Sequence, residues 1–241
     1  MLIVNADDYG CEKETTDRIL TCYLLKRIHC ASAMTFMADS ERAADLAREN
    51  KLPVGLHLNL DREINGSQLP AKLRETHCKI ASYLNARKWN MLIYNPFLHN
   101  YFDYVFQAQW DEFCRLYGEE PKRLDGHHHM HLCMNMLLSG KIPKGIQVRR
   151  NFSFNSEEKP IINRLYRCLV DWWLQRNYLC TDTFFSMTPL NQGVSSHERL
   201  RRPLLLSKFS AVEILFHPGL ENEYMFLLSP EWEKIILQQN Q

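Results

Sequence analysis

Short apolar runs that end in polar residues recur along this chain and predict β-strands. Leu2–Ala6 is such a run, and Asp7 and Asp8 follow it directly. In Val54–Leu60 apolar and polar positions alternate, which places His57 on the polar face of a half-polar strand. Adjacent carboxylates at a strand end offer a metal ligand and a base. Because side chains alternate along a regular strand, Asp7 and Asp8 are expected to point in opposite directions.

Two further runs extend the pattern. Ala33–Met37 predicts another strand, and Ala211–Phe216 predicts a late strand that leads into His217. Alternation places Glu213 on the same face as His217. Several strands that each end in chemically useful side chains imply a common rim.

Segments with helical spacing separate the strands, and the alternation predicts an α/β protein with one distorted (β/α) barrel, TIM-like, over residues 1–241. In such a barrel the active site lies at the carboxyl ends of the strands. The apolar positions of the predicted helix Glu157–Asn177 are expected to pack in the core. The predicted helices are Glu12–Lys26, Glu41–Asn50 capped by Ser40, the second half of Tyr94–Tyr117 with a stop at Gly118, and Glu157–Asn177 with Ile161, Leu165, Leu169, Trp172 and Trp173 as its apolar positions.

The stretch richest in histidine is Asp125-Gly-His-His-His-Met-His131, which holds four histidines within five residues. If the segment is extended, His127, His129 and His131 share one face and His128 points to the other. Neutral imidazole is the commonest protein ligand for zinc and related ions, so the tract predicts a metal site rather than a solvated polyhistidine loop.

Composition narrows the class of protein. The 241 residues are 45% hydrophobic, enough for one enzyme-sized domain, and the formal charge of +1 gives no general attraction for nucleic acid or anionic membranes. No apolar run reaches transmembrane length, and no leader precedes the first strand, so a cytoplasmic protein is expected. The eight cysteines form no Cys-x-x-Cys pair. Most of them are expected to be reduced and buried, and packing is favoured over metal binding even for Cys133.

Four ordered motifs resemble the YdjC-like carbohydrate deacetylase family, which includes chitooligosaccharide deacetylases. The resemblance covers most of the chain. In one motif Gly126 stands where the family usually has Ser, and the chain after Gly219 is short, which implies an incomplete last barrel unit. The matching segments are Asn5-Ala-Asp-Asp-Tyr-Gly10, Gly55-Leu-His57, Asp125-Gly-His-His-His-Met-His131 and Glu213 through Gly219, with Arg149 matching a family arginine.

The resemblance implies a role for each motif residue. Asp8, His57 and His127 are the implied metal ligands, and Asp7 is the implied base, with the reverse assignment of Asp7 and Asp8 as the alternative. His217 is implied as the acid that protonates the leaving amine. The remaining assignments are Glu213 as the partner that orients His217, Arg149 as the partner of Asp7, and Asp125, His129 and His131 as residues around the ligands or in contact with substrate.

The expected activity is therefore removal of the acetyl group from an N-acetylated sugar with one divalent metal ion, magnesium or zinc. Two imidazoles and a carboxylate also suit iron, cobalt or manganese, and magnesium is the weaker chemical match. A catalytically silent metal-dependent sugar-binding protein and a metal-dependent phosphoesterase are the alternatives. The expected partner is the sugar substrate, and a homodimer is left open.

Overall fold

The fold is built on one seven-stranded sheet in which all the strands are parallel. The computed structural model describes residues 1–67, 69–154, 160–188 and 196–239. The strands are ordered β5-β4-β3-β2-β1-β7-β6 in space. Their bounds are β1 Leu2–Tyr9, β2 Cys30–Ala33, β3 Val54–Leu58, β4 Arg123–Gly126, β5 Gln147–Val148, β6 Thr183–Ser186 and β7 Val212–Phe216.

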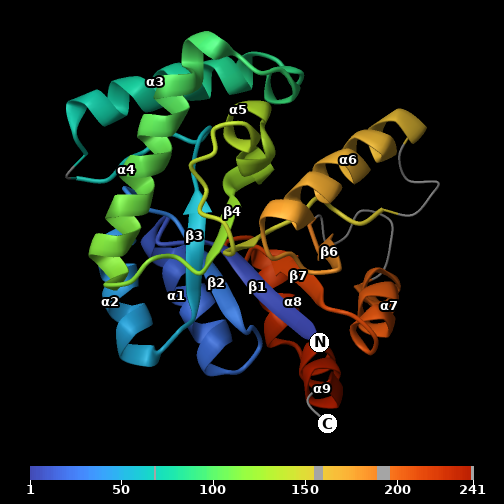
Figure 1. Cartoon of the computed structure of the whole chain (residues 1–241). Helices are drawn as coiled ribbons and strands as arrows, with labels where there is room; N and C mark the ends of the chain where they lie inside the picture. Colours follow the sequence, from blue (N-terminus) through green and yellow to red (C-terminus); the bar gives the residue numbers. More distant parts are fainter. Residues whose placement is uncertain (68, 155–159, 189–195, 240–241) are drawn as a thin grey trace.

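Helices connect successive strands and pack around the outside of the sheet (Figure 1). Helix α1 contacts β1, α4 contacts β3 and α7 contacts β7, while α3 lies across α4. Their bounds are α1 Lys13–Leu24, α2 Ser40–Asn50, α3 Ala71–Ala86, α4 His99–Tyr117, α5 Met134–Leu137, α6 Ile161–Asn177, α7 Ser196–Ser207, α8 Glu221–Leu228 and α9 Pro230–Gln239, with short 3-10 turns η1 Asn90–Leu92, η2 Pro96–Leu98 and η3 His127–Leu132.

The sheet is curled but is not a closed barrel. Strands β5 and β6 are its two edges and do not pair as strands in the described part of the chain. Contacts that join the edge regions include an isolated parallel bridge between Gln147 and Leu179 and a hydrogen bond from the Ser153 amide to the Phe184 carbonyl at 2.8 Å. After β7 the chain continues into α8 and α9 rather than into an eighth strand. The prediction of an α/β fold is confirmed, and the predicted distorted barrel is an open half-barrel in the described part of the chain.

The end of helix α4 follows a local sequence rule, whereas the end of β2 does not. Helix α4 stops at Gly118, whose φ of +74° lies in the left-handed region that glycine adopts without strain. The strand predicted at Ala33–Met37 was placed too late, because β2 ends at Ala33 and Phe36 has a φ of +57°. A left-handed residue interrupts regular strand pairing, and the apolar run after Ala33 leaves the sheet.

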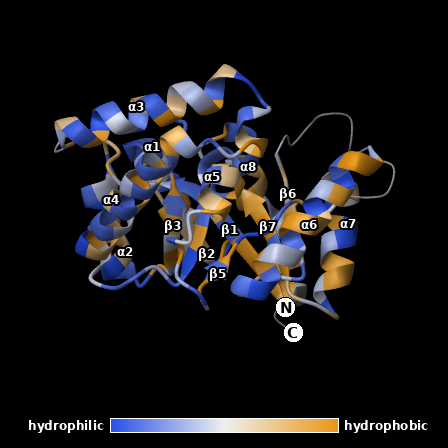
Figure 2. Cartoon of the chain, turned by 45° about the horizontal axis from the view of Figure 1, so that its top comes forward, coloured by the Kyte–Doolittle hydropathy of each residue, from blue (hydrophilic) through white to orange (hydrophobic). Residues whose placement is uncertain are grey.

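The prediction that α6 contributes its apolar residues to the core was wrong. Residues 157–159 of that predicted helix lie outside the described residues. In α6 only Val170 and Leu174 are buried, whereas Leu165 and Leu169 are 59% and 67% exposed. Figure 2 shows hydrophobic positions along this helix, in contrast to the hydrophobic strands at the centre of the molecule. The periodicity indicated an amphipathic helix correctly, but it could not tell whether a neighbour covers the apolar face.

None of the helices in the described chain is long and apolar enough to cross a membrane.

Candidate functional site

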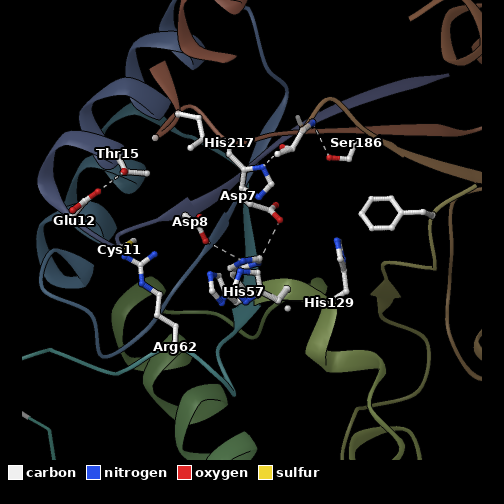
Figure 3. A pocket seen from close by; sticks show the side chains of 17 residues that line it. Asp7, Asp8, Cys11, Glu12, Thr15, His57, Arg62, His129, Ser186 and His217 are labelled. Atoms are coloured by element: carbon white, nitrogen blue, oxygen red, sulfur yellow. Dashed lines mark hydrogen bonds and ion pairs between the residues drawn. The ribbon is translucent and has the colours of Figure 1, made fainter. Parts of the chain in front are cut away.

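Strand register brings the predicted residues to one rim of the sheet. Ala6 of β1 pairs with Phe216 of β7, so Asp7 and His217 both follow that pair. His57 of β3 is the register partner of Asp125 in β4. These carboxyl ends surround a pocket of about 570 Å³, into which the side chains of Asp7, Asp8, His57 and His217 converge (Figure 3). The position agrees with the rule that parallel α/β sheets bind ligands at the carboxyl ends of their strands.

A β-bulge places both adjacent carboxylates at this pocket. Ala6 pairs with Ala31 and Tyr9 pairs with Ala33, so two residues of β1 oppose one residue of β2. Asp8 takes up the extra length with a φ of +71°. A bulge redirects side chains that a regular strand would alternate. The expectation that Asp7 and Asp8 point in opposite directions is therefore corrected, because both line the pocket.

The two histidines implied as metal ligands are held in the same way. His57 Nδ1 lies 2.6 Å from Asp125 Oδ1, and His127 Nδ1 lies 3.0 Å from Asp61 Oδ1. Burial raises the pKa of both Asp61 and Asp125. Hydrogen bonds from His127 and His128 to Asp61, and Arg149 and His57 beside Asp125, lower these pKa values by more. Both carboxylates are therefore ionised and can only accept hydrogen bonds. In its neutral form, each imidazole would donate from Nδ1 and keep Nε2 free, which is how carboxylates orient histidine ligands in metal sites.

Asp8 faces the free nitrogen of His57. Asp8 Oδ1 is 3.3 Å from His57 Nε2, yet this buried oxygen has no hydrogen-bond partner among the described residues. Burial lowers the pKa of His57, but the carboxylates of Asp7, Asp125 and Asp8 outweigh it and raise this pKa to about 10. Two electron-rich atoms that face each other need a cation between them, either a proton or a metal ion. The donor set therefore fits a divalent metal ion.

Asp7 is held on the other side of the pocket by Arg149. Burial raises the pKa of Asp7, whereas Arg149 and His57 lower it more, and the net direction is downward. Asn5 Nδ2 donates to Asp7 Oδ1 at 2.7 Å, so the carboxylate is fixed from two sides. The predicted pairing of Asp7 with Arg149 is confirmed by hydrogen bonds of 2.7 and 2.9 Å.

Glu213 does not orient His217, which corrects that expectation. Its carboxylate is buried and accepts hydrogen bonds from Arg149 Nε at 2.8 Å and Arg123 Nη2 at 3.1 Å. Glu213 lies inside β7, while His217 follows the end of that strand, so the two side chains meet different neighbours. The four-residue spacing predicts a shared face but not a contact, because four residues of strand span about 13 Å.

His217 instead contacts Thr188 and Glu223, neither of which was predicted. Thr188 Oγ1 lies 2.8 Å from His217 Nδ1 and 2.5 Å from Glu223 Oε1. Glu223 Oε2 also accepts the backbone N–H of His217 at 2.7 Å. Burial raises the pKa of Glu223, and these hydrogen bonds offset part of that rise. His217 thus sits at the pocket with a buried carboxylate behind it.

The histidine tract is not an extended strand. Strand β4 ends at Gly126, and the following turn η3 has φ values of +47° at His128 and +59° at His129. The prediction that alternate histidines share a face is therefore wrong. His131 turns back so closely that a Cβ on Gly126 would lie 2.9 Å from its backbone nitrogen, which explains why a glycine occupies that position here.

The tract histidines have separate environments in this turn. His128 is exposed and lies 2.7 Å from Asp61 Oδ2, so it remains at the pocket instead of pointing away. His129 also lines the pocket with its ring against Phe152, and burial holds its pKa well below the ordinary value. His131 is fully buried and donates from Nε2 to the Arg149 carbonyl at 2.9 Å. Cys133 is buried and does not line this pocket.

The described residues contain two groups of three side chains whose potential ligand atoms lie within 4.8 Å of one another inside each group. Neither group is the implied triad. In the group of Asp7, His57 and Asp125, both carboxylates are already bound to Arg149. The second group is Asp61, His127 and His128. Asp61 was missed because it lies in the loop after β3, where no periodic pattern applies. The carboxylates in these groups are better placed to orient histidines than to replace Asp8 as a ligand.

Comparison with known proteins agrees with these features. A family model described as YdjC-like protein matches residues 1–238. A chitooligosaccharide deacetylase of Serratia marcescens is 29% identical over 133 residues, which cover 55% of this chain and 51% of that protein. A carbohydrate deacetylase of Danio rerio is 29% identical over 139 residues, covering 54% and 42%. The chain thus spans about half the length of these curated relatives.

Structural similarity extends over nearly the whole fold. A crystal structure of an Enterococcus faecalis protein, provisionally named a cellobiose-phosphate cleavage protein, superposes with a TM-score of 0.62. The match covers 99% of this chain and 94% of that one at 21% identity. At this identity the likeness establishes a shared fold.

Proposed function

Because the chain belongs to the YdjC-like family, we propose that it is a metal-dependent hydrolase that removes the acetyl group from an N-acetylated sugar. The observation that carries the proposal is the pair of facing atoms Asp8 Oδ1 and His57 Nε2, which lie 3.3 Å apart in a pocket rimmed by ionisable side chains. The names of the matched deacetylases support the same reaction.

Asp8, His57 and His127 would hold the ion, with Asp125 and Asp61 fixing the two imidazoles from behind. A divalent ion bound there would polarise the acetyl carbonyl and lower the pKa of water. The donor set of two nitrogens and one carboxylate suits zinc, and magnesium, which prefers oxygen ligands, is the weaker match. The curled sheet is compatible with a distorted TIM-like barrel whose strand ends carry this set.

Asp7 is placed to accept a proton during the attack of water on the acetyl carbon. Arg149 keeps the carboxylate ionised, and its two hydrogen bonds leave further acceptor positions on the oxygens. As the C–N bond breaks, the leaving nitrogen takes a proton from His217, and the products are acetate and a free sugar amine. Positioned acids and bases of this kind each contribute about 10²–10⁴ in rate.

Acetate release tests the proposal directly. Purified protein, with its metal content measured before any addition, is incubated with N-acetylated chitooligosaccharides and separately with a phosphate monoester. Acetate release that stops on removal of the metal and returns when zinc is added supports the proposal. Phosphate release without acetate release would establish a phosphoesterase. Sugar binding with neither product would establish a silent binding protein.

A further inference from the structure

A buried carboxylate lies behind His217 with a hydroxyl between them. Thr188, just beyond β6, places Oγ1 2.8 Å from His217 Nδ1 and 2.5 Å from Glu223 Oε1. Glu223 belongs to the first turn of α8 and is 0% exposed. Three elements that are distant in sequence therefore converge on one imidazole at the pocket.

Hydrogen-bond counting fixes the direction of this chain of contacts. An ionised carboxylate only accepts, and a hydroxyl has a single proton to donate. With Glu223 ionised, Thr188 donates that proton to Glu223 Oε1, so its oxygen accepts from His217, whose Nδ1 must carry a hydrogen. The second carboxylate oxygen is bound by the His217 backbone N–H at 2.7 Å. Nε2 is then the ring atom that remains available to the pocket.

We propose that Thr188 and Glu223 are positioning residues that hold a proton on His217 Nδ1, so that Nε2 is the atom that protonates the leaving amine. The inference rests on the proposed deacetylation. When imidazolium transfers its Nε2 proton to the amine nitrogen, the C–N bond breaks and the ring is left neutral with its hydrogen still on Nδ1. That hydrogen remains bonded to Thr188, so the ring neither rotates nor changes tautomer between turnovers.

A purely structural role would look different. The Glu223 bond to the His217 backbone could simply fix the turn between β7 and α8. Thr188→Val keeps the side-chain shape and leaves that backbone bond in place, but it removes the acceptor for Nδ1. Glu223→Gln frees the Thr188 proton for donation to Nδ1. Both variants therefore act on the ring nitrogen more than on the turn.

The first measurement is kinetic and compares two leaving groups. On an N-acetyl sugar, Thr188→Val and Glu223→Gln are expected to lower kcat by ~10-fold or more with little change in KM, because only protonation of the amine is affected. On an activated acetyl ester, whose leaving group departs without a proton, both variants should stay within about threefold of wild type. Thr188→Ser, which keeps the hydroxyl, should retain amide turnover close to that of wild type.

The control is Thr181→Val, since Thr181 is a buried threonine near β6 whose hydroxyl has no hydrogen-bond partner in the described chain. It should leave both rates unchanged. Equal loss on amide and ester in Thr188→Val, or full amide turnover in that variant, would overturn the positioning role.

The second measurement needs no activity. ¹⁵N NMR of the His217 ring, assigned by comparison with His217→Gln and recorded where the ring is neutral, reports which nitrogen carries the proton. Wild type should show the Nδ1–H form, and Glu223→Gln should shift the ring toward Nε2–H. A wild-type ring in the Nε2–H form would overturn the inference even if acetate is released. The expected tautomers with no acetate release would keep the assignment of the proton to Nδ1 but would reject the deacetylase, and with it the role of Nε2 in protonating the amine.

Discussion

Arg149 binds both carboxylate oxygens of Asp7, with Nη1 2.7 Å from Oδ2 and Nη2 2.9 Å from Oδ1. The same guanidinium also contacts Asp125 Oδ2 at 2.9 Å and Glu213 Oε1 at 2.8 Å. Five donors in a planar fork can make these four contacts at once, whereas an ammonium group has only three donors. One residue thus couples the implied base to the carboxylate that orients His57.

Arg149→Lys is expected to destabilise the fold even though the charge is kept. Loss of the bidentate geometry leaves buried carboxylates under-satisfied, and breaking a buried ion pair costs about 3–5 kcal/mol. Urea unfolding measures the change in unfolding free energy. Arg176→Lys in the exposed part of α6 is the control, and an Arg149→Lys variant as stable as that control would contradict the role of the fork.

Asp7→Asn should nearly abolish deacetylation and leave the metal bound. The change removes the base, for which a loss of ~10²–10⁴ in rate is typical, without removing an implied ligand. Acetate release and metal content are measured on the same preparation, with Asp111→Asn on α4 as the control. Near-wild-type turnover, or loss of the metal, would reject the assignment of Asp7 as the base.

His217→Ala should lose amide turnover by ~10²–10⁴ and keep its metal, because it removes only the proton donor for the amine. Hydrolysis of an activated acetyl ester should be impaired far less. Rates on the two substrates are compared at equal metal occupancy. Equal impairment on both would show that His217 is not the acid.

Asp61→Asn should weaken metal binding by ~10–100-fold, the usual effect of removing a carboxylate that orients a histidine ligand. Asp61 contacts His127 but is not one of the implied ligands. Competition with a chromophoric chelator gives the affinity, and His127→Ala should bind more weakly still. Unchanged affinity in Asp61→Asn would mean that His127 does not need Asp61 to bind the ion.

Stability should fall on acidification because of His131. Burial lowers the pKa of His131 to about 4, although its hydrogen bond to the Arg149 carbonyl offsets part of this shift. The folded-state pKa is depressed below the unfolded value of 6.5. The contribution is therefore complete above pH 6.5 and is lost as pH falls toward 4, by up to about 3 kcal/mol.

Urea unfolding of wild type and His131→Gln between pH 7.5 and about 4 checks this effect. The variant should show a shallower loss of stability with acid, because it has no group to protonate at that position. His99→Gln on α4 retains His131 and should follow wild type. Identical slopes in wild type and His131→Gln would contradict the effect.

The sequence by itself determined the features that depend on local pattern. Strands β1, β3 and β7 were visible as apolar runs, and Gly118 marked the end of α4, because side-chain periodicity and glycine conformation are properties of short segments. The motif residues Asp7, Asp8, His57 and His217 follow or end such strands, so parallel packing alone brings them to one rim.

Tertiary structure decided how those residues are oriented and paired. The bulge at Asp8 exists because β1 pairs with β2 out of step, and no alternation within β1 reveals it. Asp61 and Glu223 reach the site from a loop and a helix whose positions depend on long-range packing. The exposure of the apolar face of α6 likewise depends on which elements pack against that helix. Periodicity specifies which side chains share a face, but only the assembled fold determines what that face meets.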